Sequence, residues 1–202
     1  QSAITSGELS KLLSGSGQIT LNSSEISVTQ NNRGFSGLWT VNAGSVLSAQ
    51  STDSITADAM LGTGEISLND GADLKLTVNG NSVLDNVISG SGDVYVEGSS
   101  EGSFAFKTLW KKAFEGTLYL SGNSQSPLTM AVSEKETSSG YNADNLAQSD
   151  YVLGEGGRLF VESGSVVNTF DDLTFAGGSI AFDSDLSIRP HENFGSLKIG
   201  GA

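Results

Sequence analysis

One seven-residue pattern, G-[ST]-G-x-[IV]-x-[LV], occurs three times in this chain of 202 residues and constrains its fold more than any other feature. The copies begin at Gly15, Gly62 and Gly90. A second pattern, F-x-G-x-hydrophobic-x-hydrophobic, begins at Phe35 and Phe114, which are 20 and 24 residues after the first and third copies. Degenerate repetition at roughly this spacing is typical of a solenoid, in which one supersecondary unit stacks on the next.

Short strand patterns accompany the repeats. Brief runs alternate apolar and polar residues, and Gly, Asn, Asp or Ser flanks nearly every run. This alternation indicates strands, and the flanking residues accept turn conformations. A helical repeat is disfavoured because no unit carries two amphipathic helices. A β-sandwich also explains short strands and turns, but it does not explain the recurrence of the two glycine motifs.

We therefore predict an all-β fold, a right-handed parallel β-helix that forms a single rod over residues 1–202. Turns of about 20 to 25 residues would give about eight turns. Inward residues such as Ile19, Ile66 and Val94 are expected to align in columns along the rod. Short helices are predicted at residues 8–13, with Ser6 as the cap, and at residues 107–114. The polar segment 133–150 is predicted to be a protruding loop.

Charge and cysteine content exclude several classes of function. Lys and Arg total 10 and Asp and Glu total 23, so the formal net charge is −13. Nucleic acids and anionic membranes both require a positive face, and we expect neither as a partner. The chain has no cysteine, which excludes disulfides, thiol catalysis and thiolate metal sites. The sequence has no stretch long and apolar enough to span a bilayer as a helix.

The sequence shows no recognisable set of residues that could act together in catalysis. His191 is the only histidine, and neither a GDSG phrase nor a G-x-S-x-G elbow occurs. Asp171 and Asp172 are adjacent, so on a strand they would point to opposite faces. Asp183 and Asp185 would share a face but lack a catalytic partner. We predict that the protein is not an enzyme, with no catalytic residues, no metal site and no cofactor.

One basic segment is a candidate partner-binding site. Lys107, Lys111 and Lys112 lie close together around Trp110 in an otherwise acidic chain. This patch could bind an anionic glycan or another partner through its cations and its aromatic ring. The alternative is a short helix that caps or interrupts the rod, with Trp110 buried and the lysines in solvent.

The two motifs in tandem resemble the passenger regions of Gram-negative bacterial autotransporters, the type V secreted proteins. Residues 15–21 with 35–47, and residues 90–96 with 114–120, occupy the roles of the two passenger motifs, and residues 173–183 also look like a passenger phrase. The resemblance covers roughly residues 12–202, and residues 121–150 depart from it. It implies export by an N-terminal signal and a C-terminal membrane domain. We recognise neither here, so we expect a passenger fragment.

The resemblance implies display on, or secretion to, the outer surface of a Gram-negative bacterium. The expected function is a non-enzymatic module for adhesion or self-association, in aggregation, biofilm formation or host attachment. Its partners would be a second copy of the chain, or a glycan or protein on a host or bacterial surface. The alternatives are an inert stalk, a membrane-proximal region that assists folding of the passenger, and, less favoured, a polysaccharide-active enzyme. Direct membrane insertion is not expected.

Overall fold

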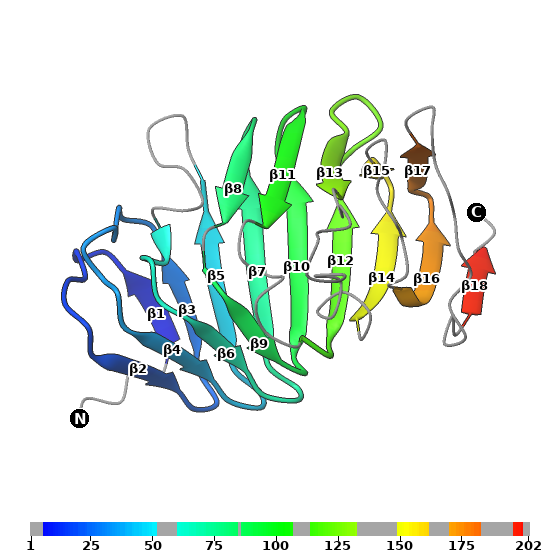
Figure 1. Cartoon of the computed structure of the whole chain (residues 1–202). Helices are drawn as coiled ribbons and strands as arrows, with labels where there is room; N and C mark the ends of the chain where they lie inside the picture. The colour runs from blue at the N-terminus through cyan, green and yellow to red at the C-terminus, as the bar shows by residue number, and fades with distance from the viewer. Residues whose placement is uncertain are drawn as a thin grey trace, which may run out of the picture.

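The computed structural model describes residues 6–51, 60–84, 86–106, 114–132, 149–161, 170–182 and 196–199. These residues form an all-β parallel solenoid, in which the chain winds through stacked turns along one axis (Figure 1). Each strand pairs with the equivalent strand one turn away rather than with its neighbour in sequence. All ladders between named strands in the described residues are parallel.

The largest sheet has nine strands and runs the length of the rod. In order, these strands are β1 (Ser6–Leu9), β3 (Glu25–Val28), β5 (Val46–Gln50), β7 (Asp73–Val78), β10 (Asp93–Gly98), β12 (Thr117–Ser121), β14 (Ser149–Gly154), β16 (Phe170–Ala176) and β18 (Ser196–Ile199).

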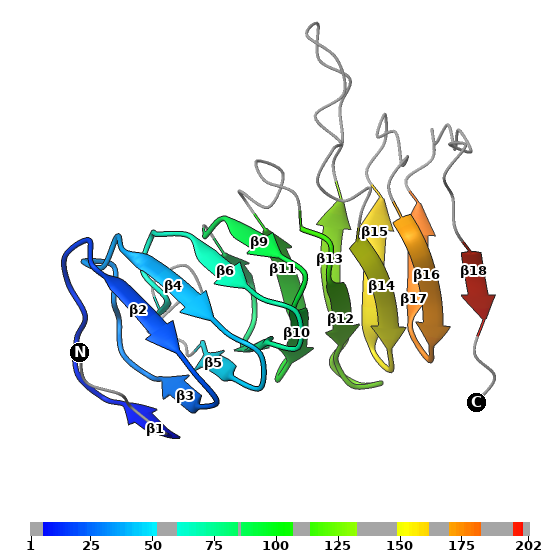
Figure 2. The same cartoon turned by 90° about the horizontal axis from the view of Figure 1, so that it is seen from below.

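Two smaller sheets complete the cross-section, one in each half of the rod (Figures 1 and 2). The four-stranded sheet belongs to the N-terminal half and contains β2 (Gln18–Leu21), β4 (Leu38–Val41), β6 (Ile66–Leu68) and β9 (Ile88–Gly90). The five-stranded sheet continues toward the C-terminus and contains β8 (Ser82–Leu84), β11 (Gly102–Phe106), β13 (Leu128–Val132), β15 (Gly157–Val161) and β17 (Ser179–Phe182).

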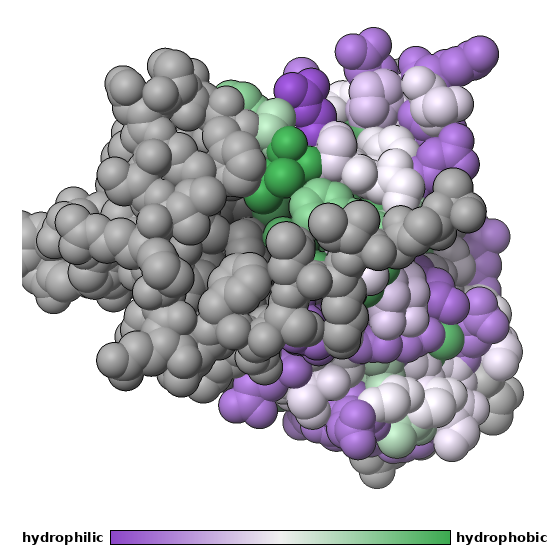
Figure 3. Space-filling model, turned by 90° about the vertical axis from the view of Figure 1, so that its right-hand side faces the viewer, coloured by the Kyte–Doolittle hydropathy of each residue, from purple (hydrophilic) through white to green (hydrophobic). Residues whose placement is uncertain are grey.

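The core consists of inward columns that follow the strand register. In the nine-stranded sheet, the residues aligned on successive rungs are all buried: Ile26, Leu47, Leu74, Val94, Leu118, Tyr151 and Leu173. Complete burial of one such side chain stabilises the fold by about 1.5–3 kcal/mol. Figure 3 views the rod from its C-terminal side, where hydrophobic residues gather near the centre and hydrophilic residues occupy much of the outside.

The predicted all-β solenoid is confirmed, but the number of turns is lower than predicted. The described residues make about six turns rather than about eight, and β1 and β18 add single strands at the two ends. The reason is that some turns are longer than predicted. Two of these long turns separate Val46 from its partner Asp73, and Thr117 from its partner Asp150. The right-handed sense of the winding stays a prediction.

The helix predicted at residues 8–13 is wrong, because Glu8 and Leu9 belong to β1 and pair with Ser27 and Val28 of β3. The apolar spacing is also compatible with an edge strand, and the ladder with β3 overrides a weak local helix preference. Residues 107–113 of the second predicted helix lie outside the described residues. Residues 133–148 of the predicted loop also lie outside them, and Ser149 and Asp150 instead begin β14.

The alignment predicted for the three glycine motifs holds for only two of them. Ile19 and Ile66 share an inward column of the four-stranded sheet, with Trp39 between them. Val94 lies in the nine-stranded sheet, aligned with Leu74, so the third copy occupies a different corner of the cross-section. The shared local pattern does not determine which corner of the cross-section a copy occupies, because both corners require a glycine turn followed by a strand.

The relation between the two motifs is the same at both corners. A parallel bridge joins Gly15 to Phe35, and another joins Gly90 to Phe114. The backbone N–H of Ser36 donates to the oxygen of Gly15 at 2.8 Å, and that of Glu115 donates to the oxygen of Gly90 at 2.9 Å. The F-x-G motif therefore stacks on the G-[ST]-G motif of the preceding turn.

Candidate functional site

Most of the residues singled out from the sequence lie outside the described residues. These are Lys107, Trp110, Lys111 and Lys112, together with Asp183, Asp185 and His191. The proposed cation-aromatic patch therefore stays a prediction, as does the predicted lack of enzymatic activity.

One acidic pair from the sequence lies within the described residues. The register between β14 and β16 shifts here, so that Asp171 and Asp172 together lie opposite Asp150. The backbone N–H of Asp172 donates to Oδ1 of Asp150 at 3.0 Å. The strand that carries Asp172 is bulged, so the regular ladder of backbone hydrogen bonds is interrupted there. The Asp150 carboxylate gives the backbone N–H of Asp172 another hydrogen-bond partner.

No group of three or more His, Cys, Asp or Glu residues suited to holding a metal ion occurs among the residues that the structure describes. The same residues contain no helix of sufficient length and apolar character to cross a membrane.

The outer face of the nine-stranded sheet is acidic. One register column on this face carries Glu25, Asp73, Asp93, Asp150 and Asp172, interrupted only by the uncharged residues Val46 and Thr117. Lys75 lies beside Asp73, with 3.5 Å between Nζ and Oδ2, and both side chains are partly exposed. An exposed pair of this kind contributes little to stability, and this column remains predominantly negative.

Two tyrosines stack at the centre of this acidic face. The rings of Tyr95 and Tyr119 are nearly parallel, with centroids 4.4 Å apart and 6° between their planes. Lys75 Nζ lies 5.6 Å from the centroid of the Tyr95 ring, within the range of a cation–π interaction. Burial, followed by the negative charges of Asp73 and Asp93, raises the pKa of the Tyr95 hydroxyl to about 12.

The outer face of the four-stranded sheet is almost uncharged. Its outward residues are Gln18, Thr20, Leu38, Thr40, Glu65, Ser67, Val87 and Ser89. The one ionisable side chain in this set, Glu65, accepts a hydrogen bond from Ser89 Oγ at 2.8 Å. Gln18 Nε2 donates to Thr40 Oγ1 at 2.9 Å, which links two adjacent turns.

An asparagine ladder borders this neutral face, formed by Asn22, Asn42 and Asn69. Each residue directly follows a strand of the four-stranded sheet. Asn42 Nδ2 donates to Asn22 Oδ1, and Asn69 Nδ2 donates to Asn42 Oδ1, each at 2.5 Å. The amides therefore lie in one line along the rod axis, at the spacing of the turns.

Buried groups hold the neutral face rigid from the inside. Trp39 is fully buried and its indole N–H donates to the oxygen of Leu61 at 2.9 Å. Phe35 meets Trp39 edge to face, with ring centroids 5.6 Å apart. Asn32 is also fully buried, accepts from the N–H of Leu13 at 2.7 Å and donates to the oxygen of Met60 at 2.8 Å. These contacts join three successive turns.

Sequence reasoning missed the asparagine ladder, although a signal for it was present. The segments ITLN, WTVN and ISLN each end in asparagine at the same offset from an alternating run. A column of identical residues is visible only once the turn register is known, and the intervals of 20 and 27 residues between these asparagines hide it.

Comparisons with known proteins identify no relative. No protein-family model, no curated protein and no solved structure matches this chain.

Proposed function

We propose that this chain belongs to a non-enzymatic, surface-displayed adhesion module that associates with a second copy of itself through the neutral face of its four-stranded sheet. The observation that supports this most is the separation of charge between two faces of one rod. The nine-stranded sheet carries an acidic column, whereas the four-stranded sheet carries hydroxyls, amides and a single carboxylate, Glu65, that is hydrogen-bonded to Ser89.

Electrostatics favour the neutral face for contact between copies. Two chains of net charge −13 repel each other at long range, so attraction must come from short-range contacts on a surface with little charge. Single pairs of side chains across such an interface contribute about 0.2–1 kcal/mol. Micromolar affinity corresponds to about 8 kcal/mol, so on the order of ten or more such contacts must form together.

Preorganisation helps many weak contacts to act together. The asparagine ladder and the bond between Gln18 and Thr40 already fix the outward side chains of adjacent turns. Their conformational entropy is therefore largely lost before a partner arrives, and less is lost on binding. Like faces of two identical rods can meet about a two-fold axis, which is the commonest symmetry of homo-oligomers.

The autotransporter passenger identity is part of this proposal, and three features support it. The chain forms a parallel β-solenoid. Its two motifs stack on adjacent turns in both tandem pairs. It also has no cysteine. The proposal includes display on the outer surface of a Gram-negative bacterium. It also includes a right-handed winding, because parallel strands joined by crossovers in one sheet are right-handed in about 98% of cases.

A charge placed on the neutral face tests the contact. We expect Thr40→Glu to weaken self-association at least tenfold, because a two-fold contact brings two added carboxylates into one interface. The matched control is Thr77→Glu, which adds the same charge beside Lys75 and Glu97 on the nine-stranded sheet and should leave association unchanged. Sedimentation velocity measures both, and beads coated with each variant report aggregation.

Three outcomes would contradict the proposal. Equal weakening by both variants would mean that total charge, rather than the neutral face, decides association. Unchanged association of the Thr40→Glu variant would place the contact elsewhere. A chain that stays monomeric at high concentration, and beads that do not aggregate, would indicate the inert stalk instead.

A further inference from the structure

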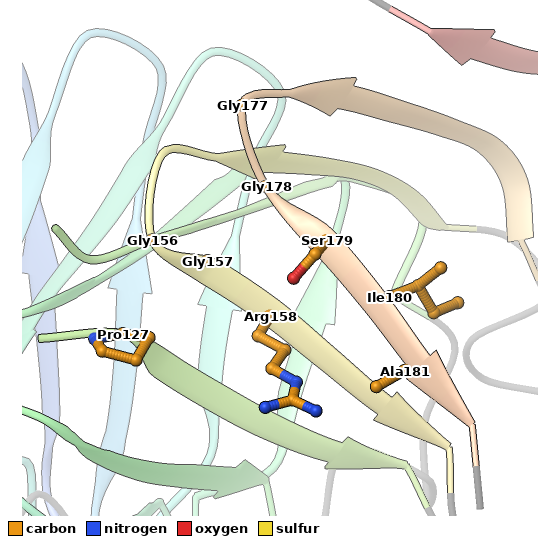
Figure 4. A pocket seen from close by; sticks show the side chains of 9 residues that line it. All are labelled: Pro127, Gly156, Gly157, Arg158, Gly177, Gly178, Ser179, Ile180 and Ala181. Atoms are coloured by element: carbon orange, nitrogen blue, oxygen red, sulfur yellow. The ribbon is translucent and has the colours of Figure 1, made fainter. Parts of the chain in front are cut away.

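A cleft of about 440 Å³ opens beside the glycine turns at the end of the five-stranded sheet (Figure 4). It lies where the turn between β14 and β15 stacks against the turn between β16 and β17. Arg158 of β15 and Ser179 of β17 are aligned on neighbouring strands and line it, together with Pro127 and Ala181. The size falls within the range of about 300–1,000 Å³ usual for small-ligand sites.

Arg158 supplies a cation to this cleft. Its side chain is exposed, and none of the ion pairs or hydrogen bonds found among the described residues involves its guanidinium. It lies on the outer face of the five-stranded sheet, aligned with the uncharged residues Thr129 and Ser179. In a chain with 23 acidic and 10 basic residues, an arginine aligned with no acid is a local exception to the negative surface.

The backbone of several glycines forms one wall of the cleft, and a residue with a larger side chain does not fit at these positions. A Cβ atom at Gly157 would lie 2.2 Å from the oxygen of Leu120, and one at Gly178 would lie 2.7 Å from the oxygens of Gly154 and Gly157. The two turns are also joined by a bridge between Gly154 and Gly177. The wall is therefore fixed, because only glycine fits where the two turns pack against each other.

The remaining wall is apolar. Pro127 and Ala181 line the cleft beside the guanidinium. Ile180 is aligned with the buried Leu159, and its side chain packs against the core instead. Figure 4 shows Arg158 and Ser179 side by side on adjacent strands, with Ala181 further along β17. A ligand that fits this surface needs an anionic group for Arg158, a hydrogen-bonding group for Ser179, and a face of C–H groups for the apolar wall.

We propose that this cleft binds a carboxylate-bearing sugar, a uronic acid residue of an acidic glycan. The planar guanidinium can donate two parallel hydrogen bonds to one carboxylate. The pyranose ring presents C–H groups to Pro127 and Ala181, and its hydroxyls reach Ser179. A singly charged carboxylate suits this acidic chain better than a doubly charged phosphate, because long-range repulsion grows with ligand charge.

Titration of the 202-residue chain with a glucuronate-containing tetrasaccharide tests the site. The comparison ligands are the same tetrasaccharide with its carboxylates methyl-esterified, sodium sulfate, and N-acetylglutamate amide as a carboxylate without a sugar. We expect the acidic tetrasaccharide to bind at least tenfold more tightly than each of the other three. Isothermal titration calorimetry measures the affinities.

Two variants and one control locate the binding on the cleft. Arg158→Gln removes the cation and should weaken binding at least tenfold, and Ala181→Leu fills the cleft while leaving the charge unchanged and should weaken it comparably. Lys75→Gln removes one positive charge from the nine-stranded sheet and should leave the affinity unchanged. Far-UV circular dichroism of each variant confirms that the solenoid is retained.

Several results would overturn the inference. Equal affinity for the ester would exclude the carboxylate contact, and equal affinity for sulfate or for N-acetylglutamate amide would exclude recognition of the sugar. Binding that Lys75→Gln weakens as much as Arg158→Gln does would indicate non-specific attraction to cations. The cleft and the neutral face lie on different sheets, so Thr40→Glu should leave glycan binding unchanged, and each idea can fail without the other.

Discussion

At the scale of single residues, the glycines of the two motifs allow successive turns to approach closely. An ideal Cβ atom at Gly37 would lie 1.8 Å from the oxygen of Gly17, and one at Gly64 would lie 1.8 Å from the oxygen of Gly37. A Cβ atom at Gly116 would likewise lie 1.9 Å from the oxygen of Gly92. The last glycine of one motif therefore stacks on the last glycine of the other, and in each case the nearest obstacle to a side chain is a backbone oxygen.

Substitution within this glycine column should be strongly destabilising. We expect Gly37→Ala to lower the free energy of unfolding by about 2 kcal/mol or more, since the turns must separate to admit the methyl group. Gly17→Ala is the matched control, because a Cβ atom there meets nothing within 4 Å and its φ is not positive. Urea unfolding followed by circular dichroism compares them, and equal losses would refute the stacking argument.

At the scale of the strand and the turn, the sequence predicts the existence of elements better than their place. The alternating runs at residues 19–21 and 94–96 are strands, as predicted. They lie in different sheets, because the glycine motif specifies a corner and a strand but not which corner. The helix predicted at residues 8–13 is wrong for a related reason: pairing with β3 is a long-range contact that a short window of sequence does not contain.

The asparagine ladder should stabilise the corner that follows the four-stranded sheet. Asn42 accepts from Asn69 and donates to Asn22, so Asn42→Ala removes both bonds, whereas Asn22→Ala removes one. The net contribution of one hydrogen bond to the free energy of unfolding is about 0.5–1.5 kcal/mol. We expect the loss of unfolding free energy for Asn42→Ala to be about twice that for Asn22→Ala. Chemical denaturation measures both, and a smaller loss at Asn42 would contradict the ladder.

The tyrosine pair predicts a change of stability at high pH. Burial, with the charges of Asp73 and Asp93, raises the pKa of Tyr95 in the folded chain to about 12, above the ordinary value of 10.0. The protonated hydroxyl is therefore favoured by folding. Its contribution to stability is fully present below pH 10 and is lost as the pH rises from 10 to about 12, because over that range the unfolded chain loses the proton more readily than the folded chain.

Two measurements check this pH dependence. In an ultraviolet titration of phenolate, one tyrosine should ionise near pH 12, and Tyr95→Phe should remove that transition. The same variant should show a smaller fall in unfolding free energy between pH 10 and 12. Asp93→Asn should shift the Tyr95 transition downward because it removes one of the carboxylates that repel the phenolate. A Tyr95 transition near pH 10 in the unmodified chain would contradict the environment described.

At the scale of the whole molecule, composition predicts the class of fold but not the distribution of charge over its faces. The net charge of −13 is a property of the chain, whereas its segregation onto the nine-stranded sheet depends on register. Neighbouring positions in this acidic column, such as Asp73 and Asp93, lie on different turns of the solenoid, so no local pattern reveals it. The Arg158 cleft was missed for the same reason, because it forms only where β15, β17 and the residue before β13 come together.

This charge distribution predicts how self-association responds to salt. If two rods meet through their neutral faces, the main opposing force is long-range repulsion, which salt screens over a Debye length of about 8–10 Å at ordinary ionic strength. Hydrogen bonds and apolar contacts between the neutral faces are affected much less. Self-association should therefore strengthen as ionic strength rises from about 0.01 to about 0.15 M, where the Debye length falls from about 30 to about 8 Å. Sedimentation velocity across a salt series measures this, with Thr40→Glu as the variant that should associate more weakly than the unmodified chain at each salt concentration. Dimers that dissociate as salt rises would mean that opposite charges hold them together, as when Lys107, Lys111 and Lys112 of one copy dock on the acidic nine-stranded sheet of another.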